Sequence, residues 1–121
     1  MRKLEQEFKT EIIDLWKKAK TFKYVFCIET EETEPGFPDV MAIREDNTCA
    51  FFEFKVTNKK GKMKFERSQP VFYMRHKEME IHLFVYDNSS DRDRFYDVPI
   101  CKVLPHIKNK LEVYTDEILN C

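Results

Sequence analysis

The segment "CAFFEFKVT", residues 49–57, indicates how this chain folds, because its apolar and charged side chains alternate with a period of two. Residues i and i+2 of a β-strand project from the same face of the sheet. Phe52 and Phe54 therefore share one face, and Glu53 and Lys55 share the other. Charged groups on a partly covered face are costly unless something compensates them. The segment thus predicts a strand of a sheet and, on that strand, a site.

The tripeptide Glu-Phe-Lys occurs twice, at 53–55 and at 7–9. The second location falls in a segment with helical spacing of apolar residues, so residues 2–20 are predicted to form an amphipathic helix. Two residues along a helix correspond to about 200° around its axis, so Glu7 and Lys9 would point apart. The residues of the expected apolar stripe are Leu4, Phe8, Ile12, Leu15, Trp16 and Ala19.

The rest of the chain predicts an α/β fold with a mixed β-sheet flanked by helices, in the order α-β-β-β-α-β. Ser68 suits a helix N-cap and Pro70 the first turn of a helix. At 121 residues, the chain is expected to form one domain, 1–121. The expected strands are 23–30, 37–45, 49–57 and 81–87, with a helix over 68–77, a loop at 58–64, a short strand at 95–98, a short helix within 99–110 and an ambiguous tail.

Composition favours a soluble, cytoplasmic protein. Hydrophobic residues make up 42% and charged residues 36% of the sequence, and no apolar run has the length of a signal peptide or a membrane span. We therefore expect no membrane partner. The cysteines have no CxxC spacing and the three histidines complete no zinc pattern, so reduced structural thiols are expected. The cysteines are Cys27, Cys49, Cys101 and Cys121.

Positive charge is concentrated in one segment. Between Lys55 and Arg67 there are six positive residues and one negative residue, a local charge of +5, which leaves −6 for the rest of a chain whose net charge is −1. Such a run is either a solvated loop or a loop that contacts nucleic-acid phosphates, and both interpretations remain open. The candidate DNA-backbone contacts are Lys59, Lys60, Lys62, Lys64 and Arg67.

A second carboxylate is expected beside Glu53. Asp39 directly follows "GFP", residues 36–38, and antiparallel pairing across the turn at 46–48 would bring it near Glu53. Two converging carboxylates without a Cys or His partner suit Mg²⁺ or Mn²⁺. A neighbouring lysine such as Lys55 suits the orientation of a nucleophilic water or the neutralisation of transition-state charge.

The order of these elements resembles the PD-(D/E)xK nuclease superfamily, particularly its Holliday-junction-resolvase-like and VRR-NUC branches. The segment "GFPD" at 36–39 is similar to the "GxPD" element of the family, and 53–55 matches its ExK motif. Gln69 matches its downstream glutamine. The resemblance covers about residues 5–87 and implies a restriction-endonuclease-like fold.

The resemblance also implies a function. The chain is expected to be a DNA endonuclease dependent on Mg²⁺ or Mn²⁺ that hydrolyses phosphodiester bonds. Asp39, Glu53 and the backbone carbonyl of Phe54 would bind the metal, and Lys55 would assist the attacking water. Homodimers that cut branched or Holliday-junction DNA are common in this branch, so a role in recombination, repair or phage DNA processing is expected.

The family often adds a glutamate from its first helix, and Glu5, Glu7 and Glu11 compete for that position. At 100° per residue, Glu5 lies about 40° from the centre of the expected apolar stripe and Glu7 about 120° away. Glu5 is therefore the predicted residue.

Several alternatives remain open. An acidic segment, 29–36, stands where archaeal resolvases have an arginine, and it is either a plain acidic loop or a source of extra metal ligands. Phe72 and Tyr73 either stack on bases or pack in the core. Only two glycines, Gly36 and Gly61, are present, which excludes a Walker loop and a dinucleotide fingerprint. The rival functions are a nickase, exonuclease or restriction-like enzyme of the same superfamily, and a catalytically silent DNA-binding module.

Overall fold

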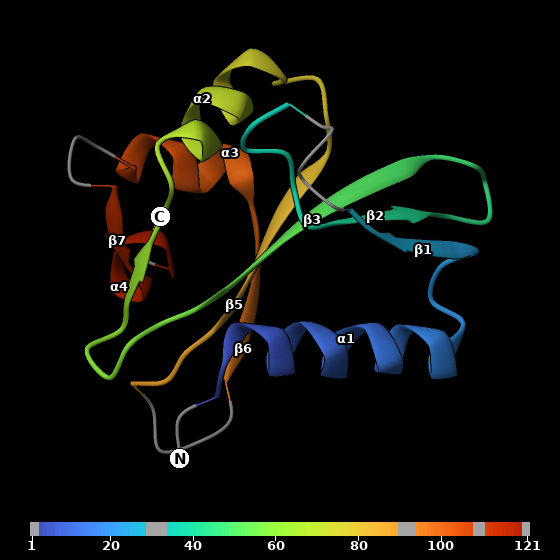
Figure 1. Ribbon diagram of the computed structural model, residues 1–121, viewed down its shortest axis with the longest axis horizontal. Coiled ribbons are helices and arrows are strands. Elements are labelled where there is room, and N and C mark those ends of the chain that lie inside the picture. Colours follow the sequence, from blue (N-terminus) through green and yellow to red (C-terminus); the bar gives the residue numbers. More distant parts are fainter. Residues whose placement is uncertain (1–2, 29–33, 90–93, 108–110, 120–121) are drawn as a thin grey trace.

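A five-stranded mixed sheet forms the centre of the computed structural model, which describes residues 3–28, 34–89, 94–107 and 111–119 (Figure 1). Its strand order is β1-β2-β3-β5-β6, and β4 and β7 form a separate two-stranded sheet. The elements are α1 (Glu5–Ala19), β1 (Tyr24–Cys27), β2 (Val40–Ile43), β3 (Cys49–Val56), β4 (Lys62–Lys64), α2 (Ser68–Arg75), β5 (Ile81–Tyr86), β6 (Phe95–Pro99), α3 (Ile100–Val103), a 3₁₀ turn (Leu104–His106), β7 (Glu112–Tyr114) and α4 (Thr115–Leu119).

Strand β3 lies in the middle of the sheet, antiparallel to β2 and parallel to β5. The pairing of β2 with β3 begins at Val40 opposite Phe52. Asp39, one residue earlier, therefore lies at the point where β2 leaves β3, beside Glu53. Because β3 continues beyond this point with β5 as its neighbour, Glu53 and Lys55 lie along an edge that β2 no longer covers.

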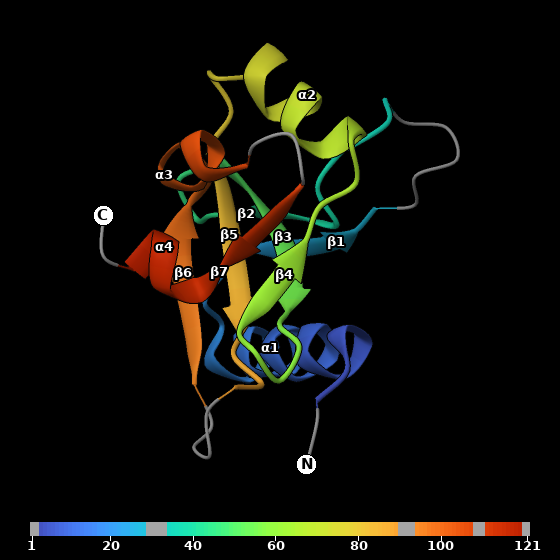
Figure 2. The ribbon, with the colours of Figure 1, turned by 90° about the vertical axis from the view of Figure 1, so that its left-hand side faces the viewer.

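Helices and small strands cover the two faces of the sheet. Helix α1 lies across one face, whereas α2, α3 and the β4–β7 pair lie on the other (Figures 1 and 2). Phe52 and Phe54 pack under α1 with Phe8, and all three are nearly inaccessible to solvent. The opposite face of β3, which carries Glu53 and Lys55, is turned toward α2. The predicted alternation along β3 thus separates the aromatic core under α1 from the opposite face, where Glu53 and Lys55 lie beside a second hydrophobic core formed with α2, α3 and the β4–β7 pair.

The predicted fold class and the order α-β-β-β-α-β are confirmed. The loop predicted at 58–64 is wrong in part, because Lys62–Lys64 forms β4 and pairs with β7 in the tail. The short strand and the short helix predicted after residue 94 are present as β6 and α3.

The buried face of α1 differs from the predicted stripe. Phe8, Ile12 and Ile13 are buried, whereas Leu4 and Leu15 are 57% and 58% exposed. Ala19 is also exposed and Trp16 is half-buried. At 100° per residue, the centre of the buried face lies about 60° from Phe8, and Leu4 and Leu15 fall on its far margin.

None of the helices in the described part of the chain is long and apolar enough to cross a membrane. Cys27, Cys49 and Cys101 are exposed free thiols. Cys121 lies outside the described residues.

Candidate active site

Asp39 and Glu53 bring two carboxyl groups together at the start of β2. The backbone N–H of Phe54 donates a hydrogen bond of 3.2 Å to Oδ2 of Asp39, which fixes the Asp39 side chain against β3. Glu53 is 2% exposed, and its carboxyl group lies within the electrostatic field of the Asp39 carboxylate. The predicted proximity of the two carboxylates is therefore present in the structure.

Burial raises the pKa of Glu53 well above its usual range. The charge of Asp39 and the hydrogen bond shared with it raise this pKa further, and Glu5 acts in the same direction. The ammonium group of Lys55 partly opposes these effects by lowering it. A buried carboxyl beside a second carboxylate is a strained electrostatic arrangement that a cation would relieve.

Gln69, in the first turn of α2, holds the end of Lys55. Its Oε1 atom accepts one hydrogen bond from Nζ of Lys55 at 3.1 Å and another from the backbone N–H of Glu66 at 2.8 Å. The ammonium group also lies 5.0 Å from the centre of the Phe65 ring. Lys55 is therefore held in one position next to the two carboxyl groups rather than extended into solvent.

Gly36, in the turn before Asp39, packs closely against the start of α2. Its φ of +87° is in the left-handed region, and a Cβ atom at this position would lie 2.2 Å from the backbone oxygen of Ser68. Only glycine permits this close approach. Because Ser68 directly precedes Gln69, this contact fixes the position of Asp39 relative to Gln69, and thus to Lys55.

Glu5 is the glutamate of α1 that reaches this site. Partial burial of its carboxyl group raises its pKa, Lys55 lowers it, and Asp39 raises it, so the carboxyl lies within the electrostatic field of both groups. Glu5 falls about 60° around the helix from Phe8, on the side of α1 that faces the sheet, but at the first position of the helix the residue as a whole is exposed. Glu7 projects about 160° away from Glu5 around the helix axis, and Glu11 pairs with Lys3 at 2.6 Å.

Asn88 holds the segment that precedes Glu5. Its side chain accepts a hydrogen bond from the backbone N–H of Lys3 at 2.8 Å and donates one to the Lys3 carbonyl at 3.0 Å. It donates another to the carbonyl of Thr57, at the end of β3, at 2.8 Å. The start of α1 is thereby fixed to the strand that carries Glu53. Nothing in the sequence indicated that Asn88 has this anchoring role, because its partners are backbone atoms of residues distant in sequence.

The basic residues lie on the connection that leaves β3 and returns to α2. Lys59 and Lys60 occupy an exposed turn, which is stabilised by Asn58 through its bonds to the N–H groups of Lys60 and Lys62. Lys64 and Arg67 are exposed as well. Lys62 forms an ion pair of 3.5 Å with Glu112 of β7, so its charge is partly compensated within the protein.

The structure bears on two questions that the sequence left open, the role of the acidic segment 29–36 and that of Phe72 and Tyr73. Glu34 forms ion pairs with Arg75 at 3.0 Å and with His76 at 2.6 Å, which gives it a structural role that attaches its segment to α2. Glu29, Glu31 and Glu32 lie outside the described residues. Phe72 and Tyr73 are each 1% exposed, so they pack in the core and are not available to stack on bases.

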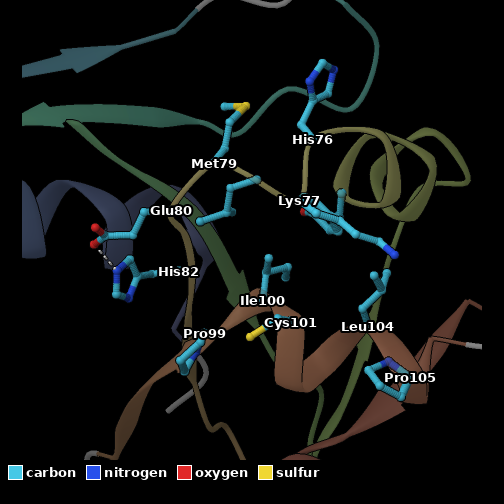
Figure 3. Close-up of a pocket in the computed structure, with 12 residues that line it drawn as sticks. His76, Lys77, Met79, Glu80, His82, Pro99, Ile100, Cys101, Leu104 and Pro105 are labelled. Atoms are coloured by element: carbon cyan, nitrogen blue, oxygen red, sulfur yellow. Dashed lines mark hydrogen bonds and ion pairs between the residues drawn. The ribbon is translucent and has the colours of Figure 1, made fainter. Parts of the chain in front are cut away.

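Two pockets lie elsewhere on the described part of the molecule. One of about 580 Å³ lies between the end of α2, the start of β5 and α3, and its lining includes Met79, Ile100 and Leu104 (Figure 3). Another of about 630 Å³ includes Trp16 and Arg44. Neither is lined by Asp39, Glu53 or Lys55. The candidate site is therefore formed by convergent charged groups outside these two pockets.

The donor set of the site fits a divalent metal ion. Among the described residues, no three side chains of the His, Cys, Asp and Glu types come together as a metal-binding group. Asp39 and Glu53 alone provide adjacent carboxylates, and Oε1 of Glu53 is buried without a hydrogen-bond partner. Mg²⁺ typically takes one or two carboxylates and fills its remaining positions with water or substrate phosphate. The site therefore fits a cation that is completed by its substrate.

The layers, sheet order and paired carboxyl groups define the class of the fold, a restriction-endonuclease-like α/β fold. No protein-family model matches the sequence, and no curated protein is significantly similar to it. The structure is similar to the 1.6 Å structure of Hjc, a Holliday junction resolvase from the archaeal hyperthermophile Archaeoglobus fulgidus. The TM-score is 0.62 at 15% sequence identity, over 95% of this chain and 92% of Hjc. At this identity the likeness establishes the fold alone.

Proposed function

We propose that this protein is a metal-dependent DNA endonuclease of the PD-(D/E)xK kind that hydrolyses phosphodiester bonds in branched DNA. The observation that carries the proposal is the buried Glu53 carboxyl beside Asp39, with Lys55 held next to both by Gln69. A fold that only binds DNA gains nothing from a buried pair of acidic groups, whereas metal-dependent hydrolysis of a phosphodiester uses such a pair to hold the metal ion. The similarity to a Holliday junction resolvase supports branched DNA as the substrate.

Asp39 and Glu53, with the carbonyl of Phe54, would hold Mg²⁺ or Mn²⁺. When bound, such an ion acts as a Lewis acid: it neutralises charge on the scissile phosphate and lowers the pKa of bound water. Lys55 orients the attacking water and offsets charge that develops on the phosphate oxygens. Gln69 keeps the Lys55 ammonium group in place, and Glu5 adds a negative group at the rim of the site.

DNA would reach this site along the basic connection between β3 and α2. Lys59, Lys60, Lys64 and Arg67 are exposed and lie next to Lys55 and Gln69 in sequence, so they are the proposed contacts to the phosphate backbone. Lys62 would contribute less, because Glu112 already pairs with it. A homodimer would present two such sites to a junction.

The experiment is cleavage of labelled four-way junction, flap, nicked and linear duplex DNA with Mg²⁺, Mn²⁺ or EDTA. We expect paired cuts in the junction that require the metal and disappear in Asp39→Asn. Preference for nicked or linear DNA would instead indicate a nickase, exonuclease or restriction-like enzyme. A folded wild type that binds junctions and cuts none of these substrates would contradict the proposal and favour a catalytically silent DNA-binding module.

A further inference from the structure

The hydroxyl group of Tyr73 has no role in the chemistry proposed above. Tyr73 is 1% exposed, and its hydroxyl oxygen has no hydrogen-bond partner among the described residues. Buried polar groups are almost always hydrogen-bonded, because an unpaired group loses its contacts with water and gains none in return. An unpaired hydroxyl at this position therefore requires an explanation.

A second buried atom of the same kind lies nearby. Oε1 of Glu53 also lacks a partner, and Glu53 is 2% exposed. Tyr73 follows Gln69 by four residues on α2, so the two side chains lie on the same face of the helix. Gln69 bonds to Lys55, which places that face of α2 over the side of β3 that carries Glu53. The charges of Glu53 and Asp39 add to burial in raising the pKa of Tyr73, as expected for a nearby hydroxyl.

The ring of Tyr73 and its hydroxyl group serve different purposes. The ring packs against Phe72 and contributes to the lining of the pocket that contains Met79 and Ile100. Phenylalanine would fill the same space without burying an oxygen atom. Packing therefore accounts for the ring but gives no reason for the hydroxyl group.

We propose that Tyr73 is a positioning residue for Glu53. Its hydroxyl donates a hydrogen bond to a bridging water that in turn donates to Oε1 of Glu53, and this bridge orients the carboxylate toward Asp39. This inference rests on the proposed function, in which Glu53 binds the metal. Groups that orient metal ligands typically change metal affinity by 10- to 100-fold when they are removed.

The test compares Tyr73→Phe with the wild type and with a matched control, Tyr86→Phe. Tyr86 is a second buried tyrosine, and it packs against Phe8 on the opposite face of the sheet. Three quantities are measured for each protein: Mn²⁺ affinity by calorimetry without DNA, the thermal midpoint in EDTA, and the rate of junction cleavage. For Tyr73→Phe we expect about 10-fold weaker Mn²⁺ binding or more, slower cleavage and no fall in the midpoint. For Tyr86→Phe we expect Mn²⁺ affinity and cleavage equal to those of the wild type.

The possible failures are distinguishable. If Tyr73→Phe binds Mn²⁺ and cleaves like a wild type that does both, the inference is overturned and the proposed function stands. If Tyr73→Phe only lowers the thermal midpoint, the hydroxyl is structural and the inference is also overturned. If the wild type neither binds Mn²⁺ nor cleaves, the proposed function fails and this inference fails with it.

Discussion

Replacing Glu53 with glutamine is expected to stabilise the metal-free protein while it abolishes cleavage. Glu53 is buried, its pKa is raised well above the ordinary value, and one of its carboxyl oxygens has no partner. Glutamine has nearly the same shape, carries no charge and can donate a hydrogen bond to Asp39. At pH values where Glu53 ionises, removal of the penalty for this buried, poorly satisfied group is worth about 1–3 kcal/mol or more. For a domain of this size, each kcal/mol raises the thermal midpoint by roughly 4 °C.

The sign of the pH dependence follows from the raised pKa of Glu53. Between the pKa of the unfolded chain, near 4.5, and the higher pKa of the folded protein, the folded state holds more protons. The contribution of Glu53 to stability is therefore complete below about pH 4.5 and declines as the pH rises through the folded pKa. The advantage of Glu53→Gln should grow from pH 5 to pH 8.5.

The assay is urea unfolding of both proteins in EDTA across this pH range. The matched control is Glu7→Gln, because Glu7 is exposed on α1. Equal or lower stability of Glu53→Gln at pH 8.5, relative to the wild type, would refute the reasoning that Glu53 is held at an energetic cost.

Three further predictions concern the surroundings of the site. Gly36→Ala should lower the free energy of unfolding by about 2 kcal/mol or more, measured in urea, because of its left-handed φ and the contact with Ser68; an unchanged value would contradict this packing. Asn88→Ala removes three side-chain hydrogen bonds, so it should lower the free energy of unfolding by about 1–3 kcal/mol and slow junction cleavage. Cleavage at the wild-type rate would show that Glu5 does not depend on Asn88 for its position. The double variant Lys59→Ala/Lys60→Ala removes about two phosphate contacts and should lower the slope of log K for DNA binding against log salt concentration by about 2. The same change at Lys17 and Lys18, in the last turn of α1, should leave this slope unchanged. An unchanged slope would remove the 58–64 segment from the interface.

The alternation of apolar and charged side chains along β3 predicted much of the fold and of the candidate site. Phe52 and Phe54 on one face and Glu53 and Lys55 on the other fix the orientation of the strand in any sheet, and the short turn after β2 fixes its register. Both features are local, so the sequence displays them directly.

What the sequence did not show depends on contacts between distant segments. Strands β4 and β7 have three residues each and lie nearly fifty residues apart, so neither has a recognisable pattern of its own. The buried face of α1 depends on the sheet beneath it, which selects Ile13 and leaves Leu15 exposed. The bonds of Asn88 to backbone atoms, and the burial of the Tyr73 hydroxyl group, likewise depend on how the helices and strands pack.

The most direct test of the central claim compares the two copies of Glu-Phe-Lys. Cleavage of a labelled four-way junction in Mn²⁺ is measured for the wild type, Glu53→Ala and Glu7→Ala, after each is shown to be folded. We predict paired cuts by the wild type and Glu7→Ala and none by Glu53→Ala, because only Glu53 lies beside Asp39 and Lys55. Cleavage by Glu53→Ala at the wild-type rate would contradict the account.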